Sequence, residues 1–177
     1  MKTINKNGCD LEVFDDEIIE GDFIHPEKMV YFSRSITISG NLEVKAYFAE
    51  GSIFVGKSEK VGWWQKVGGS QTVGWWQKVG GRQKVGGSQT VGGRQEVGGS
   101  QTVGWSQEVG GWQEVGEGIV VGLSITVGGT MKFGLRCFAG VSPNKIASEK
   151  EKTITCEQLI CGEIAYGILV ERRLRNE

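Results

Sequence analysis

Two groups of residues in this chain have types and spacings that could support chemistry. The segment 51–58 reads Gly-Ser-Ile-Phe-Val-Gly-Lys-Ser and matches the phosphate-loop pattern Gly-x4-Gly-Lys-Ser letter for letter. That loop binds phosphate only where a strand precedes it and a helix N-terminus follows it. Here the chain continues directly into a repeat unit, and Ile53 and Val55 take the apolar positions of the repeat. We therefore expect no nucleotide and no other cofactor at this segment.

The one histidine and the four cysteines are the other candidates, as a general base or as metal ligands. His25 precedes the repeats and is followed by Pro26, so we expect it to pack in a terminal cap. No Cys-x-x-Cys spacing links the cysteines, which are Cys9, Cys137, Cys156 and Cys161. A zinc site would have to draw ligands from both ends of the chain, so we expect no metal and interpret these residues as buried thiols. The sequence thus predicts a protein that is not an enzyme.

The chain contains a repeat of six residues, Val-Gly-x-x-Gln-x, and the elements formed by this repeat would have to position any site. Val-Gly recurs every sixth residue from 55–56 to 127–128 without insertion or deletion, and Phe133-Gly134 and Ala139-Gly140 keep the phase. A fixed short period means that each unit stacks on its neighbours. We predict an all-β solenoid of parallel short strands. Its expected parts are an N-terminal cap (1–34), a hexad-repeat solenoid (35–140), and a loop with C-terminal cap strands (141–177).

Alternation within each unit predicts which side chains face the core. Valine is the consistently apolar position, and the residue two places earlier shares its side of the strand. That position is glutamine nine times in succession, at Gln65, Gln71, Gln77, Gln83, Gln89, Gln95, Gln101, Gln107 and Gln113. An unpaired buried amide costs roughly 1–3 kcal/mol. We therefore expect a buried ladder of paired amides between layers about 4.8 Å apart; wider corners that leave the glutamines partly wet are the alternative.

The number of hexads in each coil is open from the spacing alone. Three would give a triangular solenoid of about 18 residues per turn, and two would give a flat one. Near-identical units recur at both spacings, since Trp63-Trp64 matches Trp75-Trp76 and Ser70 matches Ser88. We favour the triangle because it encloses a core wide enough for glutamine and valine together. The glycine after each valine is assigned to the corner, where it can adopt a positive φ without strain.

This repeat resembles the Leu/Ile/Val-Gly-x4 hexapeptide motif of left-handed β-helix proteins. The flanking segments 36–44 and 154–170, with their spaced glycines, resemble bactofilin-type polymer-forming solenoids, and the hexads are similar to those of bacterial hexad-repeat proteins. The resemblance covers about 35–170 and implies an architecture rather than an activity. Hexapeptide-repeat enzymes use a histidine base, which the array lacks. Glutamine departs from the small or apolar residue of that family, so the handedness of the coil stays open.

Side chains at the outward positions of the array could contact a partner. Six tryptophans occupy corner and first-strand positions, where exposed clusters often mark a contact surface: Trp63, Trp64, Trp75, Trp76, Trp105 and Trp112. Folding back over the glycine corners is the alternative for them. The residue before valine is a lysine in the first half of the array and a glutamate in the second, at Lys60, Lys66, Lys78 and Lys84 and at Glu96, Glu108 and Glu114. Two antiparallel copies would set these halves against each other.

The sequence therefore predicts a structural or scaffolding solenoid that self-associates as a dimer or polymer. A recognition module that binds a glycan or protein through the tryptophans is the alternative. Lys and Arg number 20 against 21 Asp and Glu, which argues against nucleic acid as a partner. No stretch approaches the 18 or so apolar residues of a membrane span. The first residues lack the apolar run of a secretion signal, so a cytoplasmic location is expected.

Overall fold

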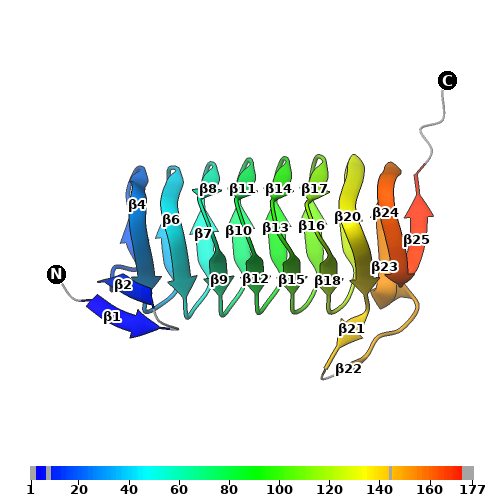
Figure 1. Ribbon diagram of the computed structural model, residues 1–177, viewed down its shortest axis with the longest axis horizontal. Coiled ribbons are helices and arrows are strands. Elements are labelled where there is room, and N and C mark those ends of the chain that lie inside the picture. The colour runs from blue at the N-terminus through cyan, green and yellow to red at the C-terminus, as the bar shows by residue number, and fades with distance from the viewer. Residues whose placement is uncertain (1–2, 7–8, 144, 173–177) are drawn as a thin grey trace.

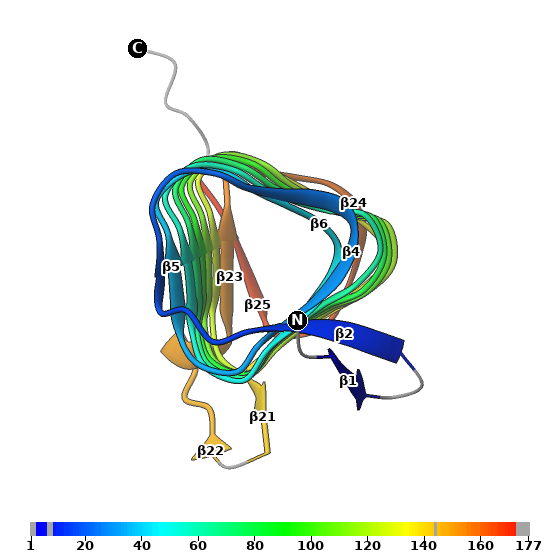
Figure 2. The same ribbon diagram turned by 90° about the vertical axis from the view of Figure 1, so that its left-hand side faces the viewer.

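The chain forms an all-β solenoid in the computed structural model, which describes residues 3–6, 9–143 and 145–172. Short strands stack in parallel at a spacing of 18 residues; Gln71–Val73, for example, lies opposite Gln89–Val91. Figure 1 shows the coils side by side along the long axis, and Figure 2 shows their triangular outline. The predicted solenoid with three hexads in each coil is confirmed.

The strands of the array form three faces, which we name after their central strands. The β10 face contains β5 (Ile36–Ile38), β7 (Ile53–Val55), β10 (Gln71–Val73), β13 (Gln89–Val91), β16 (Gln107–Val109), β19 (Ile125–Val127) and β23 (Thr153–Cys156). The β11 face contains β8 (Glu59–Val61), β11 (Gln77–Val79), β14 (Gln95–Val97) and β17 (Gln113–Val115). The β12 face contains β9 (Gln65–Val67), β12 (Gln83–Val85), β15 (Gln101–Val103) and β18 (Ile119–Val121).

Longer strands bend around a corner near both ends. The N-terminal elements are β1 (Thr3–Lys6), β2 (Cys9–Phe14), β3 (Ile18–Ile19), β4 (Phe23–Phe32) and β6 (Leu42–Ala49). The C-terminal elements are β20 (Thr130–Ala139), β24 (Gln158–Tyr166), β25 (Ile168–Glu171), the side hairpin of β21 (Val141–Ser142) and β22 (Lys145–Ile146), and the 3-10 helix η1 (Lys150–Lys152). Strands β6 and β20 each pair with both the β11 and β12 faces. Among the described residues no helix is long and apolar enough to cross a membrane.

The coils extend beyond the array at both ends. Strands β2 and β4 stack on β6, and β3 stacks on β5, so a coil is already present before residue 35. Likewise β24 stacks on β20 and β25 on β23. The segments expected to be caps are therefore built largely as further coils of the same solenoid.

The coil is right-handed. In Figure 2 the N-terminal end faces the viewer, and the chain runs clockwise from β5 to β6 as it recedes. This is the usual hand of a connection between parallel strands of one sheet. The winding thus differs from that of the left-handed β-helix proteins whose motif the repeat resembles.

The core is a column of inward valines and glutamines. Every hexad valine from Val55 to Val127 is at most 1% exposed. At the N-terminal end the column is continued by aromatic side chains, with Phe14, Phe23, Phe32 and Tyr47 in edge or tilted contact at centroid distances of 4.9–6.2 Å. The inward side of each strand is therefore the one that alternation predicts.

The corner glycines are needed for a different reason from the predicted positive φ. Among the described glycines, a positive φ occurs at Gly21, Gly140, Gly162 and Gly167, none of which follows a hexad valine. A Cβ on Gly92 would lie 2.0 Å from the carbonyl oxygen of Gly74, one coil earlier, and a Cβ on Gly110 would lie 2.1 Å from that of Gly92. The prediction was wrong on this point. Successive corners stack so closely that the carbonyl of one coil occupies the space of a side chain in the next.

Candidate functional site

A column of glutamine amides runs through the core along the solenoid axis. All nine predicted glutamines are at most 2% exposed. From Gln89 to Gln113, each Nε2 donates to the Oε1 atoms of the glutamines 12 and 18 residues earlier, over 2.7–3.5 Å. Each rung is therefore tied to two others, and every donor points toward the N-terminal end.

The donor end of the column terminates on Glu59, which is fully buried at the glutamine position of β8. Its carboxyl accepts from Gln77 Nε2 at 2.9 Å, from Gln71 Nε2 at 2.8 Å and from the Tyr47 hydroxyl at 3.4 Å. An ionised carboxylate can only accept, so it requires the neighbouring amides to present their NH2 groups. Glu59 was not among the sequence-predicted residues, although its place two residues before Val61 puts it in the glutamine column.

Burial dominates the titration of this cluster. It raises the pKa of Glu59 from 4.5 to about 7, although the polar groups of Gln77, Gln71, Tyr47 and Gln65 beside the carboxyl act in the opposite direction. Burial, together with the nearby Glu59 charge, also raises the pKa of Tyr47 well above its usual value. The cluster can hold or release one proton near neutral pH, with no solvent contact to the carboxyl.

The two ends of the column are not equally satisfied. Gln65, the first predicted rung, has neither amide atom paired, so the ladder begins at Gln71. At the other end, the Oε1 atoms of Gln107 and Gln113 have no donor. Apolar side chains follow there, at Ile119, Ile125 and Met131, which are fully buried and offer no N–H.

The structure distributes the six predicted tryptophans over three corners of the triangle. The first corner, between the β10 and β11 faces, carries Trp75, Trp76 and Trp112, and the second, between the β11 and β12 faces, carries Trp63 and Trp64. Trp105 lies alone on the third corner. Residues 12 apart fall on different corners of an 18-residue coil, so the six do not share one face. The indoles of Trp63, Trp75 and Trp105 are 53%, 67% and 61% exposed, and the other three are half-buried.

Arginines lie beside the tryptophans at both of the first two corners. Arg94 follows Trp76 by one coil and precedes Trp112 by one coil, and its Cζ is 5.8 Å from the Trp112 ring centroid. This is a cation–π distance. Trp76, Arg94 and Trp112 contribute to a recess of about 240 Å³. A larger recess of about 590 Å³ lies at the second corner, beside Trp63 and Arg82.

The predicted lysine and glutamate halves are spread over all three faces. Lys66 and Lys84 project from the β12 face and Glu108 from the β10 face, whereas the remaining four lie on the β11 face. Neighbouring coils of the β11 face pair their charges as Lys60–Glu43 at 2.6 Å, Lys78–Glu96 at 2.8 Å and Lys132–Glu114 at 2.7 Å. These pairs within one chain leave fewer charges on this face to orient a second copy.

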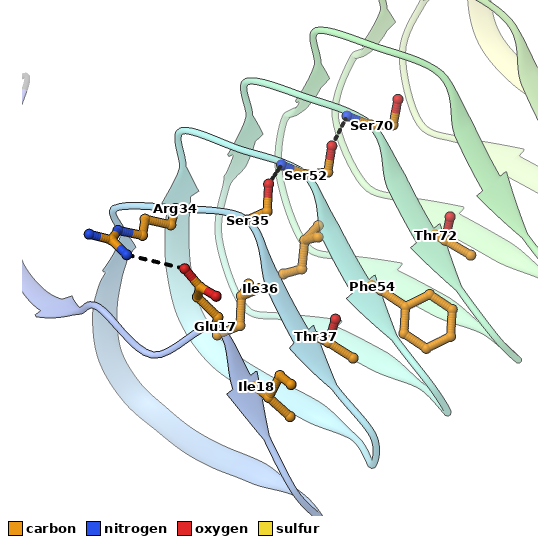
Figure 3. Close-up of a pocket in the computed structure, with 11 residues that line it drawn as sticks. Glu17, Ile18, Arg34, Ser35, Ile36, Thr37, Ser52, Phe54, Ser70 and Thr72 are labelled. Carbon is orange, nitrogen blue, oxygen red and sulfur yellow. Dashed lines mark hydrogen bonds and ion pairs between the residues drawn. The ribbon is translucent and has the colours of Figure 1, made fainter.

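A shallow groove of about 630 Å³ lies on the N-terminal part of the β10 face (Figure 3). The exposed ion pair of Arg34 with Glu17, at 3.1 Å, flanks it, and Phe54 projects from its surface. Along the third corner, Ser52 N donates to Ser35 Oγ and Ser70 N donates to Ser52 Oγ, each at 3.0 Å. These serines satisfy the backbone of successive coils, which is a structural role.

The residues that could have supported catalysis or bound a metal lie in separate parts of the fold. The phosphate-loop match forms β7 and its two corners, with Ile53 and Val55 buried. His25 packs edge-on against Phe23 with ring centroids 4.7 Å apart. The four cysteines are free thiols; Cys137 and Cys156 are buried as predicted, whereas the prediction was wrong for Cys9, which is half-buried, and for Cys161, which is exposed. Burial raises the pKa of Cys137 to about 12. Within residues 3–6, 9–143 and 145–172, no three His, Cys, Asp or Glu side chains converge as a metal site would require.

Comparisons of the chain with protein-family models, with curated proteins and with solved structures found no match.

Proposed function

We propose that the chain is a non-enzymatic structural solenoid that pairs with a second copy of itself through its C-terminal coil. The observation that carries this proposal is the open edge of that coil. Among the described strands, β24 pairs in the sheet only with β20, and β25 only with β23. One N–H group of the β24 edge, that of Leu159, donates to the Glu171 side chain at 2.8 Å. A row of unpaired backbone N–H and C=O groups is a ready surface for pairing with another chain.

The same coil has apolar side chains at inward positions, and no further layer of described residues covers them. Leu159 lies opposite Met131 and Leu169 opposite Ile154, both fully buried one coil earlier, yet the two leucines stay partly exposed. Full burial of a leucine stabilises by roughly 1.5–3 kcal/mol. A symmetric contact buries such residues from both copies, which offsets part of the cost of association.

The N-terminal end supports pairing less well. Its aromatic cluster already fills the core there, and β1 pairs with β2 in an antiparallel hairpin that covers part of the edge. We therefore propose a tail-to-tail dimer with two-fold symmetry, the commonest symmetry of protein oligomers. The two-fold axis would set the β24 edges of the two copies antiparallel and give a rod of twice the length.

The mass in solution tests this proposal. Light scattering should give about twice the chain mass of 19.3 kDa for the wild-type protein. Leu169→Lys adds a charge at a position 36% exposed in one copy and should yield a folded monomer, as checked by circular dichroism. The matched control Ile18→Lys changes a residue that is 68% exposed near the N-terminal end and should remain dimeric. A monomeric wild type, or a dimeric Leu169→Lys, would refute the tail-to-tail contact.

Recognition of a glycan or protein through tryptophans is the second candidate function. It is favoured by the exposure of more than half of the indole at Trp63, Trp75 and Trp105. An exposed aromatic surface of this kind usually serves contact with a ligand or partner. The three indoles lie on three corners, so each would contribute to a separate site rather than to one continuous face.

A further inference from the structure

The recess at the second corner is a trough with a wall at each end. The position after the corner glycine is Trp63 in one coil, Gly81 and Gly99 in the next two, and Glu117 in the third. Two successive coils therefore have no side chain at this position. With strands about 4.8 Å apart, the backbones of the two walls lie roughly 14 Å from each other. The trough, of about 590 Å³, opens to solvent between an indole and a carboxylate.

Two side chains extend along this trough. The Cδ1 atom of Trp63 lies 3.6 Å from the place that a Cβ of Gly81 would take, and Arg82 Cγ lies 3.5 Å from the corresponding place at Gly99. Each side chain therefore extends over the glycine of the next coil. At the far wall, the Glu117 carboxylate accepts a hydrogen bond from Ser100 Oγ, which orients it.

Three backbone donors on the floor of the trough are already in use. Gly80 N donates to Val61 O at 2.8 Å, and Gly98 N donates to Val79 O at 2.8 Å. Gly99 N donates to Gly81 O at 2.9 Å. A peptide strand that added along this surface would find these three donors occupied. Selectivity has to come from the indole, the guanidinium and the carboxylate.

We propose that this trough binds a neutral disaccharide unit of a glycan, which gives the recognition function named above a specific site and ligand class. Trp63 would stack on the apolar face of one sugar ring, Arg82 would donate to hydroxyls, and Glu117 would accept from them. A charged ligand would be attracted by Arg82 or Glu117 and repelled by the other. Hydroxyl groups both donate and accept, so a neutral sugar satisfies both side chains.

Indole N–H signals in ¹H–¹⁵N NMR spectra test the proposal on the full chain. The six signals are assigned with single Trp→Phe variants, and cellobiose, N,N′-diacetylchitobiose, maltose and lactose are titrated separately. At least one sugar should shift the Trp63 signal saturably, with a Kd on the order of 1 mM, and leave the Trp105 signal in place. Glu117→Gln should weaken that binding about tenfold, a difference of about 1.4 kcal/mol.

A pair of matched glycine variants tests the trough itself. Gly99→Ala places a Cβ on the floor, 3.1 Å from Gly81 O, and should weaken binding. Gly111→Ala makes the same 3.1 Å approach to Gly93 O at the first corner and should leave binding unchanged.

The possible outcomes separate the site from the general function. A response of Trp75 without one of Trp63 would refute this trough while supporting recognition at another corner. No response of any indole to the four sugars would refute both the trough and the recognition of such glycans through the tryptophans. Equal shifts of Trp63 and Trp105 would mean non-specific contact and would also refute the trough.

Discussion

The buried carboxyl of Glu59 should make the solenoid less stable as the pH rises toward neutrality. Its pKa is about 7 in the folded chain, against an ordinary value of 4.5. Between these two pH values the folded chain holds the proton and the unfolded chain does not. Stability therefore falls as the pH rises from 4.5 to 7, and this group adds no further change above or below that window.

The size of the effect follows from the difference between the two pKa values. Seven minus 4.5 is about 2.5 pH units, and each unit corresponds to 1.36 kcal/mol, so the loss is about 3 kcal/mol. Glu59 is fully buried, so solvent does not screen the penalty on its charged form. A loss of this size is a large fraction of the 5–15 kcal/mol that holds a typical domain folded.

Glu59→Gln removes the titrating group and keeps its shape. The amide oxygen can still accept from Gln71 and Gln77, and the new NH2 can donate to the Tyr47 hydroxyl, which in the wild type donates to Glu59. We expect the variant to be about 3 kcal/mol more stable than the wild type at pH 8, with the advantage shrinking as the pH falls toward 4.5. Urea unfolding followed by far-UV circular dichroism between pH 5 and 8 measures this difference.

The control is Glu108→Gln, the same chemical change on an exposed side chain of the β10 face. It should follow the wild-type pH dependence. Parallel pH profiles for the wild type and Glu59→Gln would refute the reasoning. So would a Glu59→Gln variant that is less stable at pH 8, because the amide donors would then stabilise the carboxylate by more than its burial costs.

Three further predictions concern the core and its thiols. Gln95→Leu should lower the free energy of unfolding in urea by about 2 kcal/mol, because four neighbouring rungs each lose one hydrogen bond. An unchanged midpoint would contradict the ladder. Gly92→Ala should destabilise by at least about 2 kcal/mol through its clash with the carbonyl of the preceding coil. Gly118→Ala should be tolerated in the same assay, because its Cβ would come only within 3.2 Å of Arg136 O. Cys161 is exposed and should be alkylated in the folded chain well before Cys137, whose thiol is buried with a pKa of about 12; equal labelling by mass spectrometry would argue against this packing.

The architecture and the inward residues could be predicted from the sequence because they depend on local rules. Alternation along a strand sets which side faces the core, and an unbroken period of six keeps each unit equivalent to the next. The valine column followed from these rules, and the same rules placed the glutamines inward. The corner glycines were predicted in the right places but for the wrong reason, since the clash that excludes a Cβ involves a carbonyl one coil away.

Features that depend on contacts with the neighbouring coil were harder to predict from the sequence. The tryptophans could be sorted into corners, and the charges into faces, only once the coil was known to contain 18 residues. Lys78 and Glu96 are far apart in the sequence yet form an ion pair across adjacent coils. Glu59 was not predicted because the run of glutamines begins at Gln65, although Glu59 has the same position in its hexad as each glutamine.

The direction of the glutamine ladder explains why its two ends differ. Each amide donates its hydrogen bonds toward the N-terminal end. A ladder of any length therefore has unmatched donors at one end and unmatched acceptors at the other. Glu59 and Tyr47 take up the donors of Gln71 and Gln77 with acceptor oxygens. The acceptors of Gln107 and Gln113 meet an apolar layer and remain unpaired. The free-energy cost of the unpaired atoms at the two ends does not grow with the length of the ladder, whereas every added rung makes its own hydrogen bonds. This difference favours a long, uninterrupted run of near-identical hexads.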